Sequence, residues 1–143
     1  MKKTLMALAL SLASTLALAQ ATPAGLWRTI DDETKTEKSL VRITETGGVF
    51  TGKVEKIADP AKQDSKCDKC TDARKDQKVV GMTIVTGVKK AENEAYFDGG
   101  EILDPNNGKV YKVRMTPKDG GKAMEVRGFI GPFYRNQTWQ RVE

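Results

Sequence analysis

Apolar and polar residues alternate along most of the chain from residue 38 onward. Val41 and Ile43 share one side of their segment, and Arg42 stands on the other. The same alternation recurs in Val49–Ile57 and in Lys109–Met115. Successive side chains of a β-strand point to opposite faces, so this two-residue period is typical of half-buried strands.

Short breaks rich in Gly, Pro and Asn separate the alternating segments, as in Thr46–Gly48, Asp104–Gly108 and Lys118–Gly121. Gly adopts positive backbone angles at no steric cost, while Pro and Asn favour bends. Tight turns of this kind join antiparallel neighbours, because a parallel return needs a long crossover. The pattern predicts eight strands, at Leu26–Asp31, Lys38–Thr44, Val49–Ile57, Val79–Thr86, Ala95–Leu103, Lys109–Thr116, Ala123–Ile130 and Asn136–Val142.

Two tryptophans, Trp27 and Trp139, stand in the first and the last of these strands. Eight antiparallel strands form either an up-and-down barrel or a two-sheet sandwich, and consecutive hairpins favour the barrel. If the first and last strands are neighbours, the Arg141 guanidinium can lie over the Trp27 indole in a cation–π contact. We therefore expect Trp27, Trp139 and Arg141 to close an all-β barrel. One long connection, Ala58–Lys78, interrupts the meander.

The N-terminus has the pattern of an export signal. Lys2 and Lys3 precede an apolar stretch, Leu5–Leu18, and Ala17-Leu18-Ala19 supplies the small residues of a cleavage site before Gln20. The stretch is too short for a membrane span, and no later segment is long enough. We expect a signal peptide over residues 1–19 and a single domain over residues 20–143 that is periplasmic or secreted.

The charge pattern argues against a nucleic-acid partner. The formal net charge is +5 and would fall to +3 with the loss of Lys2 and Lys3. The remaining acids and bases are interleaved, whereas a nucleic-acid binder gathers its basic residues on one stripe. A solvated surface of mixed charge is the prediction.

Cys67 and Cys70 are the sharpest local signal in the long connection. In an oxidising compartment, two cysteines so close together most simply form a disulfide that staples their loop. A redox centre would place the first cysteine at a helix N-terminus in a βαβ unit, which this pattern lacks, although Lys66 and Lys69 would favour a thiolate. A zinc site needs four ligands, and the chain has two cysteines and no histidine. A covalent haem site needs a histidine where Thr71 stands.

The sequence shows little catalytic equipment. Without histidine, Ser-His-Asp and Cys-His machinery is excluded. Asp98 and Asp104 share a strand parity, but Glu101 faces the other way. The turn Asp104–Gly108 begins like a calcium loop, yet apolar and basic residues stand where further oxygen ligands are required. We expect no cofactor, no metal site and no enzymatic activity.

A set of short motifs spans nearly the whole mature chain. The motifs are Gly25-Leu26-Trp27, Gly52-Lys53-Val54, Cys67-x-x-Cys70, Val80-Gly81-Met82, Gly99–Pro105, Val126–Gly131 and Thr138–Arg141. Together they resemble a family of exported bacterial proteins of unknown function, and the opening Gly-x-Trp with an Arg in the last strand is similar to the lipocalin pattern. The resemblance implies a lipocalin-like barrel with an internal cavity and small-molecule binding or transport. It implies no catalytic or ligand-contacting residues.

These observations lead to the hypothesis of a barrel that binds a small apolar or amphipathic molecule. A closed eight-stranded barrel either packs its interior with side chains or holds one small ligand, and both outcomes remain open. Strand parity suggests the residues that line such a pocket, with Arg127 as an anion-holding group: Phe50, Met82, Ile84, Tyr96, Tyr111 and Arg127.

The alternative hypothesis is a cell-envelope interaction module. It would use the basic, cysteine-containing loop Lys62–Lys78 to contact a protein partner or an anionic surface. Its basic side chains are Lys66, Lys69, Arg74, Lys75 and Lys78. The sequence does not indicate an oligomeric state.

Overall fold

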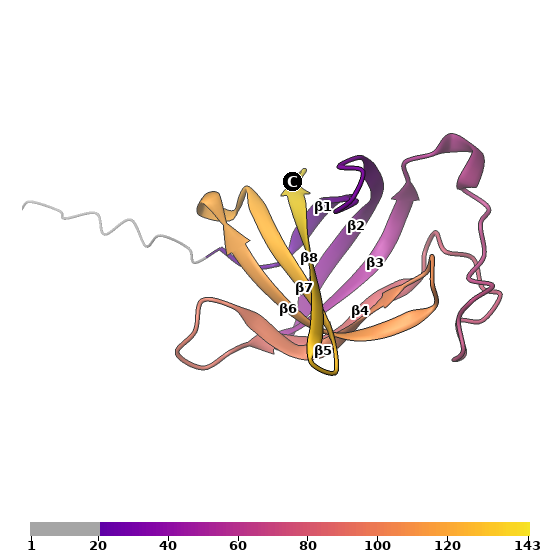
Figure 1. The fold of residues 1–143 in the computed structure, drawn as a ribbon. Coiled ribbons are helices and arrows are strands. Elements are labelled where there is room, and N and C mark those ends of the chain that lie inside the picture. The colour runs from indigo at the N-terminus through magenta and orange to yellow at the C-terminus, as the bar shows by residue number, and fades with distance from the viewer. Residues whose placement is uncertain (1–20) are drawn as a thin grey trace, which may run out of the picture.

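The computed structural model describes residues 21–143, so the predicted signal peptide and its cleavage site lie outside the described residues. Each strand pairs antiparallel with the next along the chain, and the last pairs with the first, which closes the barrel (Figure 1). The predicted up-and-down barrel is confirmed. Its strands are β1 (Gly25–Ile30), β2 (Glu37–Thr46), β3 (Val49–Ile57), β4 (Thr83–Lys90), β5 (Phe97–Asp104), β6 (Lys109–Lys118), β7 (Ala123–Ile130) and β8 (Phe133–Arg141), with 3₁₀ turns η1 (Pro60–Lys62) and η2 (Asp119–Gly121).

The seam between β1 and β8 is held by Arg141. In the register of the two strands Trp27 lies opposite Arg141, and the guanidinium carbon sits 4.3 Å from the centre of the Trp27 ring. The guanidinium also donates hydrogen bonds to the carbonyl oxygens of Gly121, Ala24 and Thr22, at 2.5, 2.7 and 2.8 Å. Partial burial lowers the pKa of Arg141. The contact expected between Arg141 and Trp27 is therefore present, reinforced by three backbone acceptors.

The glycine of the opening Gly-x-Trp has a steric reason. Gly25 has a φ of +139°, and a Cβ atom there would overlap the Arg141 guanidinium. Two residues along, the buried Trp27 indole donates its N–H to the Pro23 carbonyl at 2.7 Å. Only glycine lets the backbone enter β1 this close to the arginine.

The turns β2–β3, β4–β5 and β6–β7 lie at one end of the barrel, which we call the closed end. Its interior is packed with side chains. The rings of Phe50 and Phe97 meet edge to face with their centroids 5.2 Å apart. Beside them, a Cβ atom on Gly52 would lie 3.0 Å from the Cβ of Val85, so the two strands leave no space there.

The fourth strand begins later than the sequence pattern predicts. The expected range Val79–Thr86 is wrong, because Val79–Met82 forms a turn in which Met82 N–H donates to the Val79 carbonyl at 3.0 Å. The strand instead runs through Gly87, whose φ is +71°. This irregularity places both Val85 and Val88 in the core, at a spacing that simple alternation does not produce.

The last strand begins earlier than predicted, at Phe133 instead of Asn136. Ile130 and Phe133 are opposite each other in the register, so Gly131 and Pro132 alone form the turn between β7 and β8. The other strands agree with their predicted ranges to within a few residues, and β3 and β7 coincide with them.

The long connection between β3 and β4 folds back on itself and is stapled by the predicted Cys67–Cys70 disulfide, which is confirmed. Cys67 N–H donates to the Gln77 carbonyl at 2.9 Å, and Asp76 N–H donates to the Cys67 carbonyl at 2.8 Å. Both cysteines are almost fully buried. We call residues 58–82 the stapled loop; it extends from the barrel at the end opposite the closed end (Figure 1).

The stapled loop docks on the β5–β6 turn. A Cβ atom on Gly108 would overlap the backbone of Lys69 and would lie 2.8 Å from the Cys70 nitrogen. The Cys67 sulfur lies 3.7 Å from the Pro105 carbonyl oxygen. The disulfide thus presses the loop against a turn that must have a glycine at this point.

Candidate functional site

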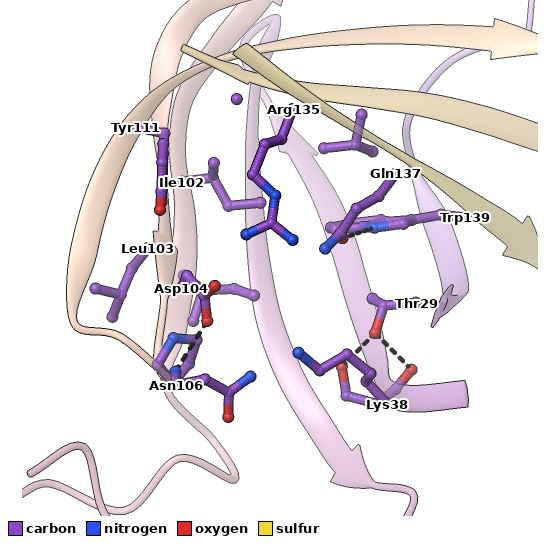
Figure 2. A pocket seen from close by; sticks show the side chains of 15 residues that line it. Thr29, Lys38, Ile102, Leu103, Asp104, Asn106, Tyr111, Arg135, Gln137 and Trp139 are labelled. Carbon is purple, nitrogen blue, oxygen red and sulfur yellow. Dashed lines mark hydrogen bonds between the residues drawn. The ribbon is translucent and has the colours of Figure 1, made fainter. Parts of the chain in front are cut away.

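At the open end, formed by the β1–β2, β3–β4, β5–β6 and β7–β8 connections, the barrel contains a cavity of about 120 Å³. Its lining comes from every strand except β3 and from the β5–β6 turn. Figure 2 shows the side chains around the cavity. The lining residues are Thr29, Lys38, Ser39, Ile84, Ile102, Leu103, Asp104, Pro105, Asn106, Tyr111, Val126, Gly128, Arg135, Gln137 and Trp139.

The deep part of the cavity is apolar. Ile84, Leu103, Val126 and Trp139 belong to its lining, and each is at least nine-tenths buried. They come from β4, β5, β7 and β8, so the apolar wall surrounds the space on several sides. Such a surface favours an apolar occupant over water, because water there would have few polar partners.

Polar groups at the wall are already paired with each other. The hydroxyl groups of Thr29 and Ser39 are 2.8 Å apart, and the Trp139 indole N–H donates to the Gln137 Oε1 at 3.1 Å. These pairings satisfy the buried polar atoms without a ligand. The Gln137 carboxamide nitrogen and the remaining hydrogen-bonding capacity of the two hydroxyl groups are left for an occupant.

One wall depends on the contact between a glycine and an aromatic ring. A Cβ atom on Gly128 would lie 3.3 Å from the Cβ of Tyr111, so the glycine makes room for the tyrosine across the β6–β7 pair. The Tyr111 hydroxyl accepts a hydrogen bond from Asn107 Nδ2 at 2.8 Å. The ring is thus fixed at both of its ends.

The rim of the cavity carries a paired arginine. Arg135 donates Nη2 and Nε to the two carboxylate oxygens of Asp32, at 2.6 and 3.2 Å. This contact lowers the pKa of Asp32 and raises the pKa of Arg135. Figure 2 shows the Arg135 side chain projecting from β8 beside Gln137. The ion pair ties the β1–β2 connection to β8, and the Asp32 carboxylate balances the positive charge of Arg135.

A second acid of the β1–β2 connection holds its backbone in shape. Asp31 accepts hydrogen bonds from the backbone amides of Thr34 and Glu33 at 2.8 and 2.9 Å, which lower its pKa to about 2. Its other carboxylate oxygen lies 3.6 Å from Lys38 Nζ. These contacts favour this conformation of the connection while the carboxylate is ionised.

A wider groove of about 790 Å³ lies between the stapled loop and the barrel wall. Residues that line both spaces show that the groove continues into the cavity: Lys38, Ser39, Ile84, Pro105 and Asn106. Val54, Ile57 and Val79 form its apolar part. The site is thus a small apolar chamber behind a broad entrance.

Two of the six pocket residues suggested by strand parity, Ile84 and Tyr111, are among those that line the cavity. The structure places the other four elsewhere. Phe50 is in the packed closed end, and Met82 is buried in the turn that precedes β4.

Tyr96 and Arg127 lie on the outer surface. Arg127 donates to Asn136 Oδ1 at 2.7 Å and stacks 4.4 Å from the centre of the Tyr134 ring. Arg114 stacks over Tyr96 at 4.0 Å. On β7 it is Met124, Val126 and Gly128 that face inward, so Arg127, one position away, points out.

The sequence analysis missed most of the cavity lining. Arg135 and Gln137 share the parity of Trp139. The predicted range Asn136–Val142 already contained Gln137, and a last strand begun at Phe133 would have included Arg135 as well. Trp139, expected only to close the barrel, is also part of the cavity wall. Thr29, Ser39 and Asn106 give no distinctive signal, because polar residues near strand ends are common.

Three of the six basic side chains of the stapled loop are paired within the loop. Arg74 bonds to Asp72 at 2.5 Å, and Lys78 lies 3.2 Å from Asp64. Lys75 contacts the Asp68 carbonyl. The loop therefore offers less free positive charge than its count of basic residues suggests.

The family of the chain is decided by residues 25–141, which match the family model described as an uncharacterised protein conserved in bacteria, DUF2147. The chain belongs to this family. The match covers the whole barrel, from the first residue of β1 to the last residue of β8. The resemblance to a bacterial family of unknown function is thereby confirmed.

Among solved structures, this DUF2147 barrel is similar to protein HP1028 from Helicobacter pylori, which is described as belonging to the lipocalin family. The similarity has a TM-score of 0.73 at 20% sequence identity, and covers 86% of this chain and 84% of that one. It shows a lipocalin-like fold. No curated protein matches the sequence. Within residues 21–143, no helix is long and apolar enough to cross a membrane.

Proposed function

We propose that this DUF2147 protein is a periplasmic binding protein that carries a small apolar or amphipathic molecule in the open end of its barrel and catalyses no reaction on it. The observation that carries the proposal is the chamber of about 120 Å³ walled by Ile84, Leu103, Val126 and Trp139. The export pattern of residues 1–19 supports the compartment.

The size of the chamber limits the molecule that it would accept. An apolar cavity of about 150 Å³ in another protein holds benzene, so this chamber suits a short alkyl end or one small ring. Any larger part of the molecule would lie in the groove under the stapled loop. The alternative of an envelope interaction module receives less support, because Arg74 and Lys78 are paired with acids of the same loop.

The proposal is tested by calorimetric titration of the mature protein with octanamide, which has an apolar tail and no charge. We expect saturable binding with a negative heat-capacity change, since apolar surface is buried. The variant Val126→Phe fills the chamber and should weaken binding at least about tenfold. Ile84→Phe serves as a second filling variant if Val126→Phe does not fold.

The matched control is Val110→Phe, which adds the same ring at a valine that is 38% exposed and lines neither space. It should bind octanamide as the unmodified protein does. Absence of saturable binding by the unmodified protein, or equal binding by Val126→Phe, would overturn the proposal.

A further inference from the structure

The lysines of the groove distinguish one class of amphipathic molecule from another. Four of them line it: Lys38, Lys62, Lys66 and Lys69. Lys38 is near Asp31, but among the ion pairs of residues 21–143 none involves Lys62, Lys66 or Lys69. Three cations without an acidic partner therefore face the entrance of the chamber.

One of the three carboxylates of the same groove is paired with a cation, and a second caps a turn. Glu37 lies 3.0 Å from Arg28 Nε, and Asp59 accepts from the Ala61 amide at 2.9 Å, which caps η1. Asp68 is the third acid in the lining. Lys62, Lys66 and Lys69 exceed the carboxylates of Asp59 and Asp68 by one charge, so the groove keeps a positive excess outside its ion pairs.

The arrangement of the lysines follows from the fold of the stapled loop. Lys62 ends η1, while Lys66 and Lys69 adjoin the disulfide cysteines and are carried on the segment pressed against the β5–β6 turn. Their backbone is therefore fixed over the groove, and only the side-chain ends remain free to adjust. Fixed cations placed beside an apolar chamber complement a molecule with one charged end.

Resting on the function proposed above, we infer that the ligand is an amphipathic anion. Its apolar end occupies the chamber, and its anionic head, a carboxylate or a phosphate, lies in the groove against Lys62, Lys66 and Lys69. Arg135 also lines the chamber, but its guanidinium is already bonded to Asp32 and does not bind the anionic head. The charge that selects the ligand comes from the stapled loop.

Three octyl compounds of one chain length test the inference: octanoate, octanamide and octylamine. Exposed ion pairs each contribute modestly, so three lysines should favour octanoate over octanamide by about tenfold, with octylamine weakest. Raising the salt concentration from about 0.02 M to about 0.5 M should reduce this preference, because the head is near solvent. Octyl phosphate distinguishes the two head groups, and it should bind at least as tightly as octanoate.

The decisive variant replaces Lys62, Lys66 and Lys69 together by Gln. It should lose the preference for octanoate and retain octanamide binding. The matched control replaces Lys53, Lys89 and Lys122 by Gln. These lysines are exposed and line neither space, so the control should keep the preference for octanoate. Octanamide binding as tight as octanoate, or a preference that survives the groove variant, would overturn the inference and leave the carrier proposal standing. If none of the octyl compounds binds, the carrier proposal itself fails.

Discussion

At the scale of single residues, Arg141 does more than the cation–π contact that its sequence position suggests. Its planar guanidinium reaches three carbonyl oxygens at once while it covers Trp27. A lysine has one charged nitrogen and cannot satisfy three acceptors in this fork geometry. With lysine at this position, carbonyl oxygens that Arg141 now binds would be partly buried without a hydrogen-bond donor.

Replacing this side chain by lysine therefore tests the seam. Arg141→Lys should lower the free energy of unfolding by about 2–4 kcal/mol, because hydrogen bonds to a charged donor are lost in a partly buried place. Urea denaturation followed by tryptophan fluorescence measures the change. Arg42→Lys is the control: its ion pairs with Glu55 and Glu143 are exposed, and it should change stability by less than about 1 kcal/mol. Equal losses in both variants would contradict the role given to Arg141.

At the scale of elements, the stapled loop is the feature that makes the open end a site. It supplies one wall of the groove, and its position depends on its contact with the β5–β6 turn. Gly108 has a φ of +73°, and a side chain there would strike the loop backbone. The substitution to alanine therefore combines backbone strain with a collision.

Gly108→Ala should accordingly lift the loop from the turn. We expect a loss of stability of at least about 2 kcal/mol and faster hydrogen exchange at the amides of Cys67 and Asp76. Gly48→Ala is the matched control, since Gly48 has a φ of +81° with open space around it, and it should cost only about 1 kcal/mol. Unchanged exchange in the loop of Gly108→Ala would show that the turn does not hold it.

The comparison of elements also shows what a sequence pattern can predict. Alternation and turn residues were enough to predict eight strands in the right order, because each strand buries one face. They failed at β4, where the turn Val79–Met82 is apolar and resembles a strand, and where Gly87 breaks the alternation. Four of the six predicted lining residues are placed outside the cavity, for different reasons. Phe50 faces inward but lies in the packed closed end, and Met82 lies in a turn instead of a strand. Tyr96 and Arg127 lie on the outer surface, since a difference of one strand position reverses a side chain. The groove lysines could not be predicted as a cluster, because only the docked loop brings them to the entrance.

At the scale of the whole molecule, the barrel has two unlike ends. Phe50, Phe97 and Val85 fill the closed end, and the Arg141 seam holds its strands together. The open end leaves a chamber lined by Ile84 and Val126, with the groove in front of it. Stability therefore depends mainly on one half of the sheet, and binding on the other.

A nuclear Overhauser spectrum of methyl-labelled protein with bound octanoate tests whether the ligand occupies the open end and not the packed end. The terminal methyl of octanoate should give cross-peaks to the methyl groups of Ile84, Leu103 and Val126, and none to those of Val41 and Val88 in the packed interior. Cross-peaks to Val41 or Val88, or none to the three chamber residues from octanoate shown to be bound, would contradict the account.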